Sequence, residues 1–103
     1  MEQLKSVVYR FSAFVRREEG SREEFSVEIC APEFSEFGDS VCRLLCHFLR
    51  EKPFWIYGVD HDQALELSRR FVEANFEHMN ACLVDADGEP VQLPPVPKAE
   101  TLA

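Results

Sequence analysis

The sequence predicts an α+β domain: an antiparallel β-sheet of four to five strands with one amphipathic helix packed on one face, in the order strand, strand, strand, strand, helix, strand. Two segments near the start alternate apolar and polar residues with a period of two, and a dense aromatic and β-branched run follows at residues 54–59. One segment, from about residue 61 to 79, has the periodicity of a helix with a single apolar side. A single helix can cover only one face of a sheet, so this order favours an antiparallel sheet with the helix on one side.

The first two strands are predicted to form a hairpin with one buried face. Residues 5–17 alternate strictly and are rich in Val and Phe, and residues 25–31 repeat the pattern after the polar turn at 18–22. Pro32 ends the second strand because proline brings no N–H to the ladder. The following segment, 33–39, reads as an acidic loop.

Residues 40–50 fit two periodicities. Helical spacing accounts for five of the apolar positions, and strand alternation accounts for four. Periodicity alone does not decide between the two. We favour a strand over residues 41–48, on the basis of a resemblance given below. Residues 54–59 then read as a strand that leads into the helix.

The helix has clear start signals. Asp60 stands at the N-cap position, and Gln63 is placed to reach back to the Asp60 backbone N–H, so the helix is predicted to begin at His61. Gly58 permits a close backbone approach that a side chain would prevent. Ser68 and Asn75 lie within the apolar arc, where their polar groups are expected to bond to nearby helix carbonyls.

Beyond the helix we expect a short strand at residues 81–84 and a turn at 85–89 that carries an Asp-Gly signal, with 91–93 returning. Residues 1–93 are predicted to form the single domain, and the proline-containing residues 94–103 a flexible tail.

Three stretches together resemble a family of small bacterial domains of uncharacterised function. They are the strand end Ile29-Cys30-Ala31-Pro32, the loop and strand Asp39-Ser40-Val41-Cys42-Arg43, and the helix start Gly58-Val59-Asp60-His61-Asp62-Gln63-Ala64-Leu65, which matches Gly-Val-Asp-x-x-Gln-Ala-Leu. The resemblance spans residues 25–72. It implies a strand for the Cys-containing segment, and it carries no catalytic residue or cofactor over to this chain.

Charge and composition limit the function classes. Nineteen acidic against eleven basic residues give a formal charge of −8, which opposes nonspecific binding to nucleic acid and to anionic membranes. No apolar run is long enough for a membrane span, and the first residues lack signal-peptide features, so we expect a cytoplasmic protein. A reducing compartment and the absence of a Cys-x-x-Cys pair argue against a disulfide framework.

No cofactor, metal or catalytic residue is predicted. Metal alternatives at Asp60, His61 and Asp62, or at Cys42 and Cys46 with His47 or His78, lack a recognised ligand spacing. The sequence contains neither a Gly-rich phosphate loop nor a nucleophile motif. We therefore expect a protein that is not an enzyme.

The remaining hypothesis is a small acidic domain that binds a protein. A basic toxin or nuclease would be steered to it, as to an immunity or antitoxin-like protein. The predicted contact residues lie in the acidic loop: Glu33, Phe34, Glu36, Phe37 and Asp39. Trp55 is a further possible anchor, although core packing is expected for it.

Three alternatives stay open beside this hypothesis. The chain could mimic nucleic acid, although its acids are interleaved with bases, or it could bind a small ligand or a metal. A homodimer could also form through an uncovered edge strand such as residues 5–17.

Overall fold

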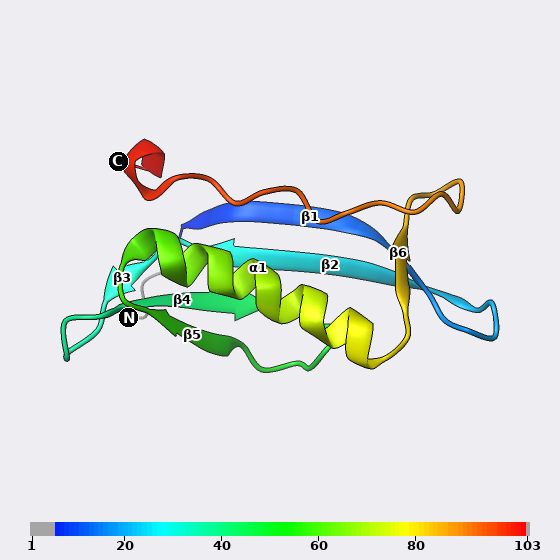
Figure 1. Ribbon diagram of the computed structural model, residues 1–103, viewed down its shortest axis with the longest axis horizontal. Helices are drawn as coiled ribbons and strands as arrows, with labels where there is room; N and C mark the ends of the chain where they lie inside the picture. Colours follow the sequence, from blue (N-terminus) through cyan, green and yellow to red (C-terminus); the bar gives the residue numbers. More distant parts are fainter. Residues whose placement is uncertain (1–5, 103) are drawn as a thin grey trace.

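One long helix lies across one face of a six-stranded antiparallel sheet (Figure 1). The computed structural model describes residues 6–102. Its elements are β1 (Val7–Arg16), β2 (Arg22–Cys30), β3 (Glu33–Phe34), β4 (Ser40–Leu45), β5 (Phe54–Gly58), α1 (His61–His78), β6 (Cys82–Val84) and the 3₁₀ helix η1 (Ala99–Leu102). The predicted fold class and element order are confirmed. The strand count is slightly higher because the loop after β2 contains the two-residue strand β3.

The strands are joined so that β4, β2 and β1 lie inside the sheet. β4 pairs with β2 and β3 along one edge and with β5 along the other, whereas β1 pairs with β2 and β6. Residue Lys5, where the first strand was expected to begin, lies outside the described residues. β6 pairs with β1 only over Phe14–Arg16, and residues 91–102 run beside the rest of that edge without strand pairing (Figure 1). A dimer through the edge of residues 5–17 therefore stays a prediction. Within residues 6–102, β5 pairs with β4 alone, and β3 and β6 likewise pair with one strand each.

β4 ends three residues earlier than predicted. The expected strand ran to Phe48, but pairing with β5 stops at Leu44 and pairing with β2 at Leu45. The chain then turns, and the N–H groups of Leu49 and Arg50 both donate to the Cys46 carbonyl at 3.0 and 3.1 Å. The alternating residues that continue to Phe48 therefore lie in a turn and not in the strand.

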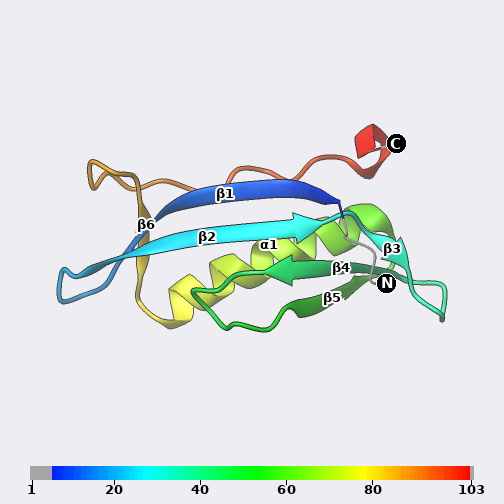
Figure 2. The same cartoon turned by 180° about the vertical axis from the view of Figure 1, so that it is seen from behind.

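Inward-facing side chains of β1, β2 and β4 form the core against the helix. Val15, Ile29, Leu44 and Leu65 are fully buried. Figure 2 shows the opposite face of the sheet, which the helix does not cover. Alternate residues of each strand therefore point away from the core.

The helix begins at His61, as predicted, with Asp60 as its N-cap: the Asp60 carboxylate accepts from the Gln63 N–H at 2.7 Å. The predicted return bond is displaced by one residue, because the Gln63 side chain accepts from the Val59 N–H at 2.7 Å and not from that of Asp60. A Cβ on Gly58 would lie 2.6 Å from the Ala64 nitrogen, so β5 and α1 meet in the close approach that glycine permits. The N-cap hydrogen bond and the close approach at Gly58 thus fix the start of the helix directly after β5.

The polar groups of the helix are satisfied as expected. The Ser68 hydroxyl donates to the Ala64 carbonyl at 2.8 Å, and the Asn75 amide to the Phe71 carbonyl at 2.9 Å. On the exposed side, Arg69 contacts both Glu66 and Glu73 at 2.7 and 3.0 Å. The hydrogen bond from Arg69 holds the pKa of the Glu66 carboxyl below its ordinary value. No helix in the described part of the chain is both long and apolar enough to cross a membrane.

Residues after β6 run back along β1 and close that side of the core (Figure 1). Leu93 is buried, and the apolar residues Val91, Val96, Ala99 and Leu102 pack against the core. The Tyr9 hydroxyl donates to the Pro94 carbonyl at 2.8 Å. Residues 94–102 are thus an extended segment with a terminal 3₁₀ turn and defined contacts, while their flexibility stays a prediction.

Candidate protein-binding surface

The predicted contact loop, residues 33–39, is held by hydrogen bonds within itself. The Ser35 N–H donates to the Asp39 carbonyl at 2.8 Å, and the Gly38 N–H donates to the Ser35 carbonyl at 3.1 Å. The Ser35 hydroxyl also donates to the Asp39 carboxylate. Gly38 has φ +91°, which an L side chain rarely adopts. Asp39, predicted as a contact residue, therefore shapes the loop.

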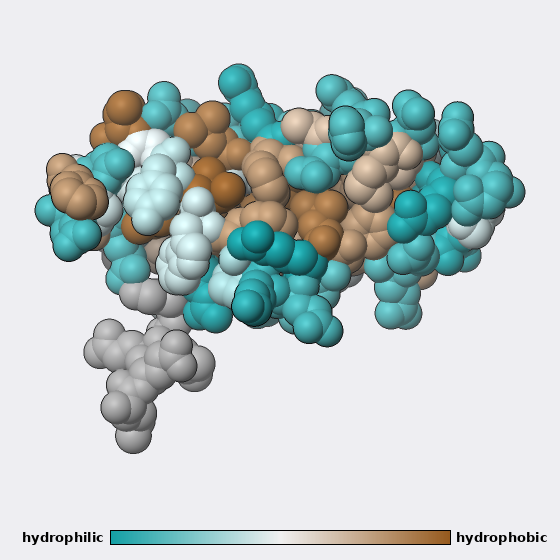
Figure 3. Space-filling view, turned by 90° about the horizontal axis from the view of Figure 1, so that it is seen from below, coloured by the Kyte–Doolittle hydropathy of each residue, from teal (hydrophilic) through white to brown (hydrophobic). Residues whose placement is uncertain are grey.

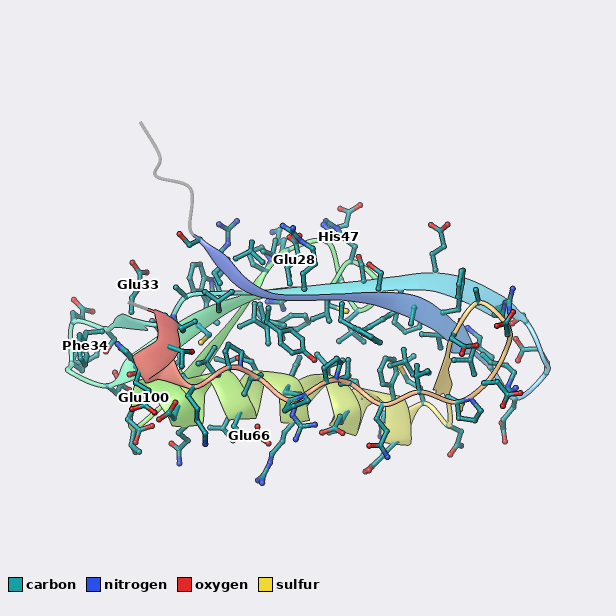
Figure 4. All side chains as sticks on the ribbon, turned by 90° about the horizontal axis from the view of Figure 1, so that it is seen from above. Glu28, Glu33, Phe34, His47, Glu66 and Glu100 are labelled. Atoms are coloured by element: carbon teal, nitrogen blue, oxygen red, sulfur yellow. The ribbon has the colours of Figure 1, made fainter. Side chains whose placement is uncertain are left out.

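Strand alternation sends the first two loop residues to opposite faces. In β3, Glu33 stands opposite Val41 and Phe34 opposite Ser40, which is buried beneath the helix start. Figure 4 shows Glu33 on the outer side of the sheet and Phe34 at the tip nearer the helix. The five predicted residues therefore do not form one surface.

An aromatic hollow lies on the outer face, where this loop meets β5. Its volume is about 520 Å³, and we define it by its lining residues Ser35, Glu36, Phe37, Val41, Trp55 and Tyr57. Phe37 is 87% exposed, Trp55 53% and Tyr57 54%. The predicted loop thus contributes Glu36 and Phe37 to a site that β5 completes.

Core packing was expected for Trp55, and that expectation is wrong. Phe54 and Ile56 pack toward the core, so the residues between and after them, Trp55 and Tyr57, point to the uncovered face. Tyr57 was missed altogether. The signal that could have found both residues was the alternation of β5 combined with the presence of only one helix.

Phe34 belongs to a second group at the start of the helix. Its ring lies 4.6 Å from that of His61, and the His61 Nδ1 is 2.6 Å from the Ser40 hydroxyl. A cavity of about 270 Å³ lies beside His61 and η1. Ser40 is fully buried, so its hydroxyl cannot meet a substrate from solvent and serves as a hydrogen-bond partner of His61.

A third hollow, of about 530 Å³, lies at the other end of the outer face. It is lined by side chains of β1 and β2 together with His47 and Phe48 from the turn after β4. Ser12 and Ser26 stand opposite each other there, and Glu24 completes its polar lining. These residues offer hydrogen-bonding groups without an assembled catalytic arrangement.

Cys30, Cys42 and Cys46 are buried, and Cys82 is partly buried. Burial raises the pKa of Cys42 to about 11 and also raises that of Cys46, so both are protonated at neutral pH. No disulfide joins Cys30, Cys42, Cys46 or Cys82. Between residues 6 and 102, no three His, Cys, Asp or Glu side chains gather in a group that could hold a metal ion.

Comparisons with known proteins found no relative. No family model, no curated protein and no solved structure matches the chain. The resemblance carried by residues 58–65 therefore stays a prediction. The function is argued below from the surface alone.

Proposed function

We propose that this chain is a small acidic, non-catalytic domain that binds one basic protein, as an immunity or antitoxin-like neutraliser would. The observation that carries the proposal is the aromatic hollow, in which Phe37, Trp55 and Tyr57 are all more than half exposed. Large aromatic side chains that line a concave surface are typical anchors of protein interfaces, because they bury much area for little loss of conformational freedom.

The charge around the hollow supports a basic partner. Glu36 lines it, and Glu33 points to the same outer face from the adjoining strand β3. The chain carries a formal charge of −8, so its field attracts a basic protein from a distance. Charge then supplies association rate, and the aromatic residues supply affinity.

The nucleophile-type side chains support a binding role over catalysis. Ser40 beside His61 is fully buried, and the Cys42 and Cys46 thiols are buried and protonated. A nucleophile must be both accessible and activated. The Ser40 hydroxyl lies 2.6 Å from His61 but is not accessible, and the two thiols are neither accessible nor activated.

The proposal is tested by affinity purification of tagged chain from cells that naturally express it, followed by mass spectrometry. We expect one stoichiometric basic protein at low salt and its loss from the Trp55→Ser/Tyr57→Ser variant. Val59→Ser is the matched control, because Val59 is 75% exposed at the end of β5 but does not line the hollow. The control variant should retain the partner.

A second experiment measures how much the charges around the hollow contribute to binding, apart from its aromatic residues. Glu33→Gln/Glu36→Gln should slow association and reduce its salt dependence, whereas Glu18→Gln/Glu89→Gln changes the same charge in distant turns and should do so less. Recovery of the wild-type chain without any partner, or retention of a partner by the aromatic variant, would refute the proposal.

A further inference from the structure

The side of the molecule along β5 has an open edge. β5 pairs with β4 through residues 54–58, and no other strand among residues 6–102 pairs with its second edge. Phe54, Ile56 and Phe71 are only partly buried, although they pack against the core. Figure 3, which views the molecule from below, shows apolar residues gathered in the middle of this side, with mainly hydrophilic residues at the right-hand end. An unpaired strand edge with apolar surroundings is a template for another strand.

Charges of opposite sign flank β5. Lys52 is exposed just before the strand, beside the exposed acid Glu51, so that Arg50, Glu51 and Lys52 together leave this end with one net positive charge; Asp60 is exposed just after the strand. Arg50 is not available in the same way, because its guanidinium donates to the carbonyls of Lys52 and Pro53 at 3.0 and 2.6 Å and lies 3.9 Å from the Phe54 ring centre. The strand therefore has a basic start and an acidic end.

This pattern is complementary to itself when reversed. An antiparallel second β5 centred on Ile56 brings Lys52 of each copy opposite Asp60 of the other, since both residues are four positions from Ile56. The same register brings Trp55 opposite Tyr57 on the outer face, and aromatic pairs across strands are favourable. A uniformly basic segment paired with β5 would be repelled by Lys52, and a uniformly acidic segment would be repelled by Asp60.

We infer that two copies of this chain associate through the open edges of β5, antiparallel about Ile56, with Lys52 of each copy beside Asp60 of the other. The sheet then continues across both copies, and the two aromatic hollows lie on one continuous outer face. This association requires no other protein and does not depend on the proposed function.

The association is expected to be weak. β5 has only five residues, so strand pairing alone buries less than the roughly 1,200–2,000 Å² typical of stable interfaces. The partly buried residues Phe54 and Phe71 beside it extend the contact, while the charge of −8 on each copy opposes it. We therefore expect a concentration-dependent dimer with a Kd in the micromolar range.

Two measurements on the purified full chain test the inference. Sedimentation equilibrium between about 1 and 200 µM, which brackets a micromolar Kd, should show a monomer–dimer equilibrium. Zero-length carbodiimide cross-linking should then join Lys52 to Asp60 in mixtures of ¹⁵N-labelled and unlabelled chain. A cross-linked peptide pair with one labelled and one unlabelled member shows that the link joins two copies.

Charge reversal supplies the variant and its control. At each end of the paired β5 strands, Lys52→Glu places the new acid beside Asp60 of the other copy, and it should weaken the dimer about tenfold. Lys98→Glu makes the same change at an exposed residue that is not part of the proposed β5 contact, and it should leave the Kd within about twofold. Circular dichroism melts confirm that both variants fold.

Tyr57→Asp gives the stronger test, because it removes one aromatic partner from each pair and adds an acid at the seam. We expect complete loss of the dimer at 200 µM or about a hundredfold weakening. A wild-type chain that stays monomeric throughout, or a dimer unaffected by Lys52→Glu and Tyr57→Asp, overturns the inference. Lys52→Glu keeps the two proposals distinguishable, because Lys52 does not line the aromatic hollow: this variant should weaken the dimer and still retain a captured basic protein.

Discussion

The two long sides of the sheet and helix are covered differently. Along β1, residues 91–102 lie over the opening between sheet and helix, bury Leu93 and accept a hydrogen bond from Tyr9. Along β5, the described part of the chain leaves one strand edge unpaired and Phe54, Ile56 and Phe71 partly exposed. The outward residues of the same strand, Trp55 and Tyr57, are exposed as well.

This contrast shows that one chain can complete its core on one side and retain a contact surface on the other. Apolar residues along β1 meet other parts of the same chain, so changes there should affect stability. Apolar residues along β5 meet solvent in the single copy, so changes there should affect binding more than stability. The following predictions, in decreasing order of expected effect, test this difference.

The largest effect is expected at Leu93. Leu93→Ala removes a side chain that is 6% exposed and leaves a cavity, which should lower the free energy of unfolding by about 2–4 kcal/mol. Tyr57→Ala, on the open side, should lower it by less than about 1 kcal/mol. Urea unfolding of both variants measures the difference, and equal losses would contradict the contrast between the two sides.

Gly58 joins the open side to the helix. Gly58→Ala would place a methyl group 2.6 Å from the Ala64 nitrogen, so β5 and α1 must move apart, at about 1–3 kcal/mol of stability. Val59→Ala is the control at the next, exposed position. The same denaturant titration applies, and a neutral Gly58→Ala would show that the close approach is not required.

The helix cap should contribute less. Asp60→Ala leaves the Gln63 N–H without its 2.7 Å acceptor and should lower stability by about 1 kcal/mol. Asp60→Ser keeps an acceptor and should retain most of the stability. If the alanine and serine variants melt at the same temperature, the capping contribution is absent.

The smallest difference concerns pH and the covered side. Burial raises the pKa of Tyr9 from 10.0 to about 12. As the pH rises, the unfolded chain therefore releases this proton before the folded chain does. The contribution of Tyr9 to the free energy of unfolding is complete below pH 10 and is lost as the pH rises toward 12. Tyr9→Phe should be less stable at pH 8, because the bond to Pro94 is gone, yet should lose less stability between pH 8 and pH 11.

Denaturant midpoints of the wild type and Tyr9→Phe at the two pH values measure this difference. Cys42, whose pKa burial raises to about 11, weakens both proteins in the same direction and cancels in the comparison. Parallel losses in the two proteins would show that Tyr9 ionises equally in the folded and unfolded states.

Features decided by neighbouring residues could be predicted from the sequence. The β1–β2 hairpin, the start of α1 at His61 and the internal bonds of Ser68 and Asn75 all follow from periodicity and local hydrogen bonding. The exposure of Phe34 and Phe37 also agrees with their position in a polar loop.

Features decided by distant residues could not. β4 ends at Leu45 because its pairing with β2 and β5 ends there, and nothing in its own alternation marks that point. Core packing is the usual expectation for a Trp side chain, but a single helix leaves the face of the sheet that carries Trp55 uncovered. The contact of Ser40 with His61 joins residues 21 apart in sequence that carry no shared motif.

The hydrogen bond between Tyr9 and Pro94 also has a kinetic consequence. It joins residues 85 apart in sequence, and closing so long a loop in an unfolded chain costs about 4 kcal/mol of entropy beyond a constant term. The hairpin and the helix form from near neighbours, so they can shorten this loop before the segment docks on β1. Docking is therefore expected to come after the folding transition state, and weakening it should accelerate unfolding while leaving the folding rate nearly unchanged.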